Sequence, residues 1–257
     1  MPAHSLIVAR KEIVDHLRDR RTLASSALYT LMGPLFVMLV SFSDQAGGKP
    51  VVLLSMMSVF ALVSAFTGGM AVAADITAGE RERRSLVPLF LTSIARRDVV
   101  FGKWLATCAF ALGALALNIA GVAAVMALRA PASLAANALP LASWVLLGLA
   151  PLACFAAALE LLASAACRTT KEAHTWLTFV VFVPMLVGMF LVFHPISANG
   201  WLALPVIGQQ LVVERALGGA PVPLLQGIVL ALATAAATIP ALAGAVAILS
   251  RDDVLAG

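Results

Sequence analysis

Six apolar runs, each long enough to cross a lipid bilayer, constrain this sequence more than any other feature. A membrane-spanning helix needs about 20 mostly apolar residues. On hydropathy, the runs fall at residues 22–41, 51–74, 104–128, 141–166, 175–193 and 223–249. The chain has 61% hydrophobic and 12% charged residues, whereas roughly a quarter of the residues in a soluble domain are charged. We therefore expect an all-α, polytopic membrane protein that forms a single transmembrane domain over residues 1–257, with six transmembrane helices.

The basic residues between these runs predict the orientation of the chain. Fourteen of the seventeen Lys and Arg residues lie in the N-terminal segment, in residues 75–103, in residues 167–174 and in the tail. The other three are Lys49, Arg129 and Arg215, which lie in the alternate linkers. Cytoplasmic loops carry an excess of Lys and Arg. This asymmetry predicts that both termini are cytoplasmic, and it gives no indication of nucleic-acid binding.

Residues 75–103 form the most charged segment of the chain. Six basic and four acidic residues flank an apolar block at residues 86–91. Each charge at the bilayer centre costs at least about 2.5–3.5 kcal/mol on insertion scales, so this segment should project into the cytoplasm. Charged rims favour specificity and buried apolar anchors contribute affinity, so the segment suits contact with another protein. The alternative is a solvated loop whose charge only fixes the topology.

Two further segments mix apolar and polar residues outside the runs. Residues 3–21 place apolar and charged side chains on opposite arcs of a helix, which predicts an amphipathic interfacial helix. A solvated juxtamembrane segment is the alternative. Residues 194–222 predict short re-entrant helices before the last span, whose backbone must be covered by protein or line a cavity. A helix lying flat in the interface is the alternative. The polar residues of this outer segment are Gln209, Gln210, Glu214 and Arg215.

Motifs that carry enzymatic chemistry do not stand out in the sequence. It contains no GxxxxGK[ST] phosphate-binding loop, no HExxH and no GxSxG, and its three cysteines lack metal-type spacing. Glu160, near the cytoplasmic end of the fourth run, is a candidate functional residue because acids inside a membrane are costly. A purely structural pairing with a neighbouring helix also accounts for Glu160. Asn118, in the third run, is expected to form a hydrogen bond between helices.

Four motifs in register resemble one protein family. The motifs are ARKEIVDHLRDRRTL (9–23), GERERRSLVPLFLTSIARRDVVFGK (79–103), CRTTKEAH (167–174) and LPVIGQQLVVERALGG (204–219). They are similar to segments of the ABC-2-type exporter permeases, especially their NatB-like branch. The resemblance covers essentially the whole chain and keeps the order of the family's elements.

The resemblance implies a permease subunit of an exporter in a bacterial inner membrane. Such permeases pair with themselves or with a sister permease, and they dock separate ABC ATPase subunits that bind ATP and Mg²⁺. This chain itself would hydrolyse no ATP and bind no cofactor or metal. The charged loop would form the coupling helix over residues 80–91, and residues 3–21 would be the connecting helix. The contact residues on the ATPase side would be Glu80, Arg81, Glu82, Arg83, Arg84, Leu86, Leu89 and Phe90.

A motor-independent membrane channel or scaffold is the alternative function. A channel requires polar or charged rings along one face of its helices. The runs contain only isolated polar residues, chiefly Asn118 and Glu160. The sequence therefore favours a motor-driven permease over a channel, and it leaves the substrate open.

Overall fold

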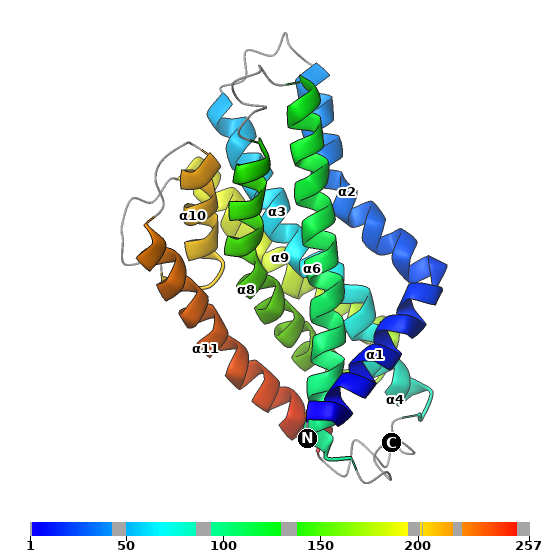
Figure 1. Cartoon of the computed structure of the whole chain (residues 1–257). Coiled ribbons are helices and arrows are strands. Elements are labelled where there is room, and N and C mark those ends of the chain that lie inside the picture. The colour runs from blue at the N-terminus through cyan, green and yellow to red at the C-terminus, as the bar shows by residue number, and fades with distance from the viewer. Residues whose placement is uncertain are drawn as a thin grey trace.

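The computed structural model describes residues 2–42, 50–85, 94–129, 138–194, 201, 203–217 and 223–250. Within these ranges the elements are α1 Pro2–Arg18, α2 Arg20–Phe42, α3 Pro50–Ala73, η1 Ala74–Gly79, α4 Glu80–Glu82, α6 Arg96–Arg129, α8 Ala138–Ala166, α9 Thr170–Phe193, α10 Ile207–Leu217 and α11 Leu224–Leu249. The long helices form a bundle, with α1, α4 and the end of α11 at one end and α10 toward the other (Figure 1).

Each of the six apolar runs coincides with one long helix. Five helices have the length and hydropathy of a membrane span: Ser55–Glu82, Arg96–Leu128, Val145–Ala166, Thr170–Phe193 and Leu224–Leu249. The α1–α2 pair, bent by 83°, passes the same test as one broken unit. Within the described residues there are thus five or six candidate spans. The predicted all-α, multi-pass architecture is confirmed.

The centre of the bundle lies where α3, α6 and α8 meet. Leu62 and Phe66 of α3 are buried there against Leu115 of α6 and Leu149 of α8. Van der Waals packing holds membrane helices together, and small residues allow their backbones to approach. Gly68 of α3 is such a residue, because a Cβ there would lie 2.4 Å from the Cβ of Ala114.

The outer faces of the bundle are apolar. Large side chains are exposed on three helices that lie away from the centre: Leu28 of α2, Phe179 and Val183 of α9, and Leu225 and Ile239 of α11. A soluble monomer rarely exposes contiguous apolar surface of this kind. In a bilayer these side chains face lipid, so the outer faces agree with the predicted spans.

α1 buries two residues of its polar arc against the protein and leaves much of its apolar arc exposed. Glu12 and His16 are buried, whereas Leu6, Ile7 and Leu17 are exposed. A soluble amphipathic helix packs the other way round. The arrangement suits a helix whose apolar face meets lipid, although its position in the headgroup layer stays a prediction.

The predicted loop over residues 75–103 is shorter in the structure. The helix of the second span continues through η1 and α4 to Glu82, and α6 begins at Arg96, eight residues before the predicted start at 104. Charged side chains persist in these helices because other parts of the chain provide their partners, as described below. The fifth span also begins earlier, at Thr170, where the Thr169 hydroxyl accepts a hydrogen bond from the Glu172 N–H.

Candidate functional site

The second span ends in an irregular helical segment. At Ala74 the α-helix changes to a π-helix, which is followed by a single α-turn and by Arg84 with a φ of 56°. Thr77 is buried here and its hydroxyl bonds both the Ala73 carbonyl and the Ser164 hydroxyl of α8. π-Helical turns are rare in proteins, and those that occur are often found at functional sites. We call residues 74–85 the junction segment.

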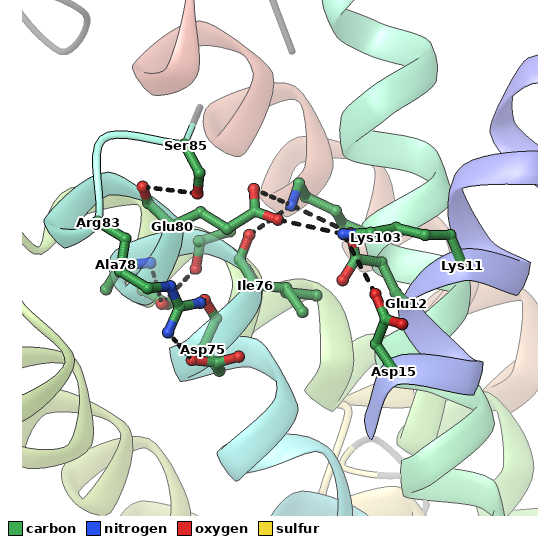
Figure 2. A network of polar contacts seen from close by, with 12 residues as sticks. Lys11, Glu12, Asp15, Asp75, Ile76, Ala78, Glu80, Arg83, Ser85 and Lys103 are labelled. Carbon is green, nitrogen blue, oxygen red and sulfur yellow. Dashed lines mark hydrogen bonds and ion pairs between the residues drawn. The ribbon is translucent and has the colours of Figure 1, made fainter. Parts of the chain in front are cut away.

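A buried cluster of charges joins the junction segment to α1 and α6. The Nζ atom of Lys103, with no solvent exposure, lies 2.7 Å from Glu80 Oε2 and 3.7 Å from Glu12 Oε1 (Figure 2). The same Nζ donates a hydrogen bond to the Ile76 carbonyl at 2.5 Å. Lys11 Nζ lies 3.1 Å from Glu12, 3.5 Å from the exposed Asp15 and 3.8 Å from Glu80, so the two cations face two buried anions and one exposed anion. Paired in this way, the charges are tolerated away from water.

A second ionic contact lies beside this cluster. The Asp75 carboxylate is 2.8 Å from Nη1 of Arg83 and 3.3 Å from Nε2 of His16. Nδ1 of His16 lies 2.9 Å from the Glu12 carbonyl within α1. The α1 helix is therefore tied to the junction segment at two places.

The junction segment also contacts the α8–α9 corner. Arg81 donates a hydrogen bond to the Cys167 carbonyl at 3.2 Å, just past the end of α8. The Glu82 carboxylate accepts two bonds from Thr170, from the backbone N–H at 2.8 Å and from the hydroxyl at 2.7 Å. Through these contacts the segment meets α1, α6, α8 and α9 within a few residues.

The residues predicted to contact the ATPase differ in their exposure and in their partners within the chain. Glu80 is buried in the charge cluster, so it does not lie on an outer surface. Arg81 and Glu82 bond the α8–α9 corner, and Arg83 is exposed while bound to Asp75. Arg84 is exposed. The predicted apolar contacts Leu86, Leu89 and Phe90 lie outside the described residues.

Asn118 forms the interhelical hydrogen bond that its position predicted. Its Nδ2 donates to the Thr30 carbonyl of α2 at 2.8 Å. Pro34, four residues after Thr30, has no N–H to offer that carbonyl, so the amide of Asn118 takes its place. Gly121 lies on the same face of α6, and a Cβ there would meet the Pro34 ring at 2.6 Å.

Glu160 is fully buried between α3, α6 and α8. Its carboxyl occupies space that Gly69 provides, since a Cβ at Gly69 would lie 2.6 Å from Glu160 Oε2 and 2.7 Å from the methyl of Thr107. Among the described residues, neither carboxyl oxygen has a hydrogen-bond partner. Glu160 lies beside Gly69, whereas Asn118 lies beside Gly33 and Thr30, so the structure does not bring Glu160 and Asn118 into one site.

The outer segment contains α10, which the surrounding helices cover. Gln209 donates to the Thr234 hydroxyl of α11 at 2.7 Å, and Gln210 donates to the Ser58 hydroxyl of α3 at 2.7 Å. Gln210 also donates to Glu214 at 2.9 Å, and Arg215 donates to Gln226 at 3.2 Å. Burial raises the pKa of Glu214, an effect that the bond from Gln210 only partly offsets. This coverage is what a re-entrant helix requires, and its depth in the bilayer stays a prediction.

Comparison with known proteins identifies the family of the chain. The family described as "ABC-2 family transporter protein" matches residues 6–201, well over half of the sequence. The chain belongs to the ABC-2 transporter family. This ABC-2 permease is 28% identical over 195 residues to a protein of Bacillus subtilis (strain 168) named ABC transporter permease protein NatB. The match covers 72% of the chain and 48% of that relative, so the chain spans about half the relative's length.

Sequence reasoning missed several partners in the junction of this ABC-2 permease. Lys103, Glu12, His16 and Asp75 were not among the predicted site residues, yet all four contact the junction segment or lie within it. A signal was present, because Lys103 immediately precedes an apolar run and a charge there needs a partner. Its partner Glu12 lies far away in the sequence, so only the fold could identify it.

Proposed function

We propose that the chain is the membrane subunit of an ATP-binding-cassette exporter, works as a dimer and is driven by separate ATPase subunits. Membership in the ABC-2 family and the likeness to a permease support this role. ATP and Mg²⁺ would bind to the partner subunits. The chain would lie in a bacterial inner membrane with both termini in the cytoplasm, on the side predicted by its basic residues.

The observation that carries the proposal is the convergence of helices on the junction segment. Residues 74–85 bond α1, α6, the end of α8 and the start of α9. A displacement applied at this segment by a soluble partner would reach several spans at once, because packed helices transmit strain. We propose that the ATPase contact involves residues 80–91, of whose described part Arg83 and Arg84 are exposed.

The buried charges link α1 to the junction segment, so α1 would also move when the ATPase displaces that segment. Glu12 shares Lys103 with Glu80, and His16 contacts Asp75. α1 and the junction segment would therefore move together. α1 leads directly into α2, so this coupling would extend to the first span.

Co-purification tests the proposal against the motor-independent channel or scaffold. A tagged chain, expressed in its native membrane and purified in mild detergent, should retain an ATPase subunit and a measurable rate of ATP hydrolysis. A matched preparation of the variant Lys103→Met, with the buried cluster broken, should couple less hydrolysis to transport. A purified chain that conducts solute without nucleotide, and retains no ATPase, would contradict the proposal and support a channel.

A further inference from the structure

A pocket of about 460 Å³ lies between α1, α2, α3 and α6, on the inner side of the bend between α1 and α2. Ile13 and Leu17 of α1, Leu23 of α2 and Phe110 of α6 contribute to its walls. Its volume falls within the range of about 300–1,000 Å³ that small-molecule sites occupy. Of the residues proposed to contact the ATPase, none that the structure describes lines the pocket.

Two hydroxyl groups interrupt the apolar lining. The Oγ of Ser26 and the Oγ1 of Thr30 are buried, and neither has a hydrogen-bond partner in the described part of the chain. They lie four residues apart on α2 and so on one face of that helix. A buried hydroxyl without a partner is costly. The pocket is therefore suited to an occupant that is mainly apolar and carries one hydrogen-bond acceptor.

The walls at the edge of the pocket are apolar and exposed. Leu17 and Leu117 line the pocket and are among the exposed large apolar residues of the chain. In a membrane such side chains face lipid, so the pocket opens toward acyl chains and away from water. The arrangement of α1, α2 and α6, whose side chains line this pocket, is shown in Figure 1.

The charges around the pocket indicate which end of the occupant lies outside. Among the side chains that the structure describes, no charged one lines the pocket, so a charged group inside it would have no partner there. Arg18 is the last residue of α1, Arg20 is the first residue of α2, and both are exposed. Basic side chains at the membrane surface attract anionic lipid headgroups.

We propose that this pocket holds one acyl chain of a membrane phospholipid, whose ester carbonyl accepts hydrogen bonds from Ser26 and Thr30 after their side chains rotate toward the pocket. A carbonyl oxygen has two lone pairs and can accept from both hydroxyls. The lipid's phosphate lies by Arg18 and Arg20. The bound chain fills the bend between α1 and α2, so it supports the angle at which α1 meets the bundle.

Photolabelling with a lipid probe tests this proposal. The probe is a phosphatidylglycerol with a diazirine in one acyl chain, mixed into vesicles of phosphatidylethanolamine and phosphatidylglycerol that contain the full chain. After irradiation, adducts should concentrate on the part of α6 from Phe110 to Leu117. The variant Gly113→Leu fills the pocket, because a Cβ at Gly113 meets no atom within 4 Å. It should lower this labelling about tenfold, the factor that 1.4 kcal/mol of lost affinity gives.

Gly148→Leu is the matched control, because Gly148 also has no atom within 4 Å of an added Cβ and lies in a helix outside the pocket. Its labelling should equal that of the wild type. The pair Ser26→Ala and Thr30→Val removes the hydroxyls without filling the pocket and should also lower labelling, which keeps the test decisive if Gly113→Leu folds poorly. Adducts spread evenly over the exposed helices and unchanged in every variant would overturn the proposal.

Discussion

Lys103 connects three parts of the molecule at a position with no solvent exposure. Its ammonium group faces Glu80 of the junction segment, Glu12 of α1 and the Ile76 carbonyl. The attraction between such buried groups repays their desolvation only when the geometry is good and the remaining hydrogen bonds are made. Replacing one partner leaves the others buried and unpaired, and this makes the cluster sensitive to single substitutions.

Lys103→Met should therefore lower the free energy of unfolding by about 3–5 kcal/mol, the usual cost of breaking a buried ion pair from one side. Unfolding in mixed detergent micelles measures the change. Lys11→Met is the control within the same cluster, because the Lys11 side chain is 57% exposed. Exposed pairs contribute about 0–1 kcal/mol, so equal losses in the two variants would contradict a buried cluster centred on Lys103.

Substitutions at Asn118 and at Pro34 should have coupled effects on the free energy of unfolding. Asn118→Ala leaves the Thr30 carbonyl without its donor, and such bonds in membrane bundles contribute about 0.6 kcal/mol on average and about 1.7 at most. In a Pro34→Ala background the backbone N–H of residue 34 can reach that carbonyl, so Asn118→Ala should cost less. A double-mutant cycle of unfolding free energies measures this. Additive effects would show that Asn118 does not replace the missing N–H of Pro34.

At the level of elements, α10 is tied to two helices through its amide side chains, with one partly buried acid at Glu214. Because burial raises the pKa of Glu214 above its unfolded value, the folded chain binds more protons between the two values. Its stability then falls as the pH rises from the unfolded pKa, about 4.3, through the folded pKa. Below this pH range Glu214 is neutral in both states, so its burial causes no loss of stability through its charge.

Glu214→Gln keeps the side chain neutral and isolates this effect. The unfolding free energy of the wild type, minus that of Glu214→Gln, should decline as the pH rises above about 4.3. Measurements of both proteins in the same micelles remove the contribution of other groups. A difference that increases with pH would place Glu214 in an environment that favours its charge, contrary to the burial of α10.

The elements differ in how far the sequence predicts them. The six apolar runs predict the long helices because a span requires a continuous apolar segment, which is visible locally. The helical course of residues 75–79 was not predicted, since the charges in this part of the chain are compensated by Glu12, His16 and Lys103 from other helices. The covering of α10 was predicted as one of two alternatives, because its partners Ser58 and Thr234 lie in distant spans.

For the molecule as a whole, the distribution of basic residues predicts which end of the bundle faces the cytoplasm. In a background without the three native cysteines, Ser85→Cys should resist an impermeant thiol reagent in intact cells. His194→Cys, at the end of α9, should react. Both residues are exposed in the structure, so burial does not protect either one. Labelling of Ser85→Cys in intact cells would show that the orientation is opposite to the predicted one.

The junction segment suits a point of force transfer because several spans meet there and one side remains exposed. Its described exposed side carries Arg83 and Arg84. Arg83 is also bound to Asp75, so its reversal disturbs a contact within the chain. Arg84→Glu alone changes the exposed charge and keeps the Asp75 contact, which separates docking from folding.

The most direct test is the amount of ATPase subunit retained on Arg83→Glu with Arg84→Glu through detergent purification. Like charges across an interface cost several kcal/mol, so affinity should fall by about two decades or more, at about 1.4 kcal/mol per decade. Insertion into the membrane should stay normal, and Arg84→Glu alone should show part of the loss. If the double variant inserts normally, retains its ATPase in full and still transports, residues 80–91 do not couple the chain to a motor.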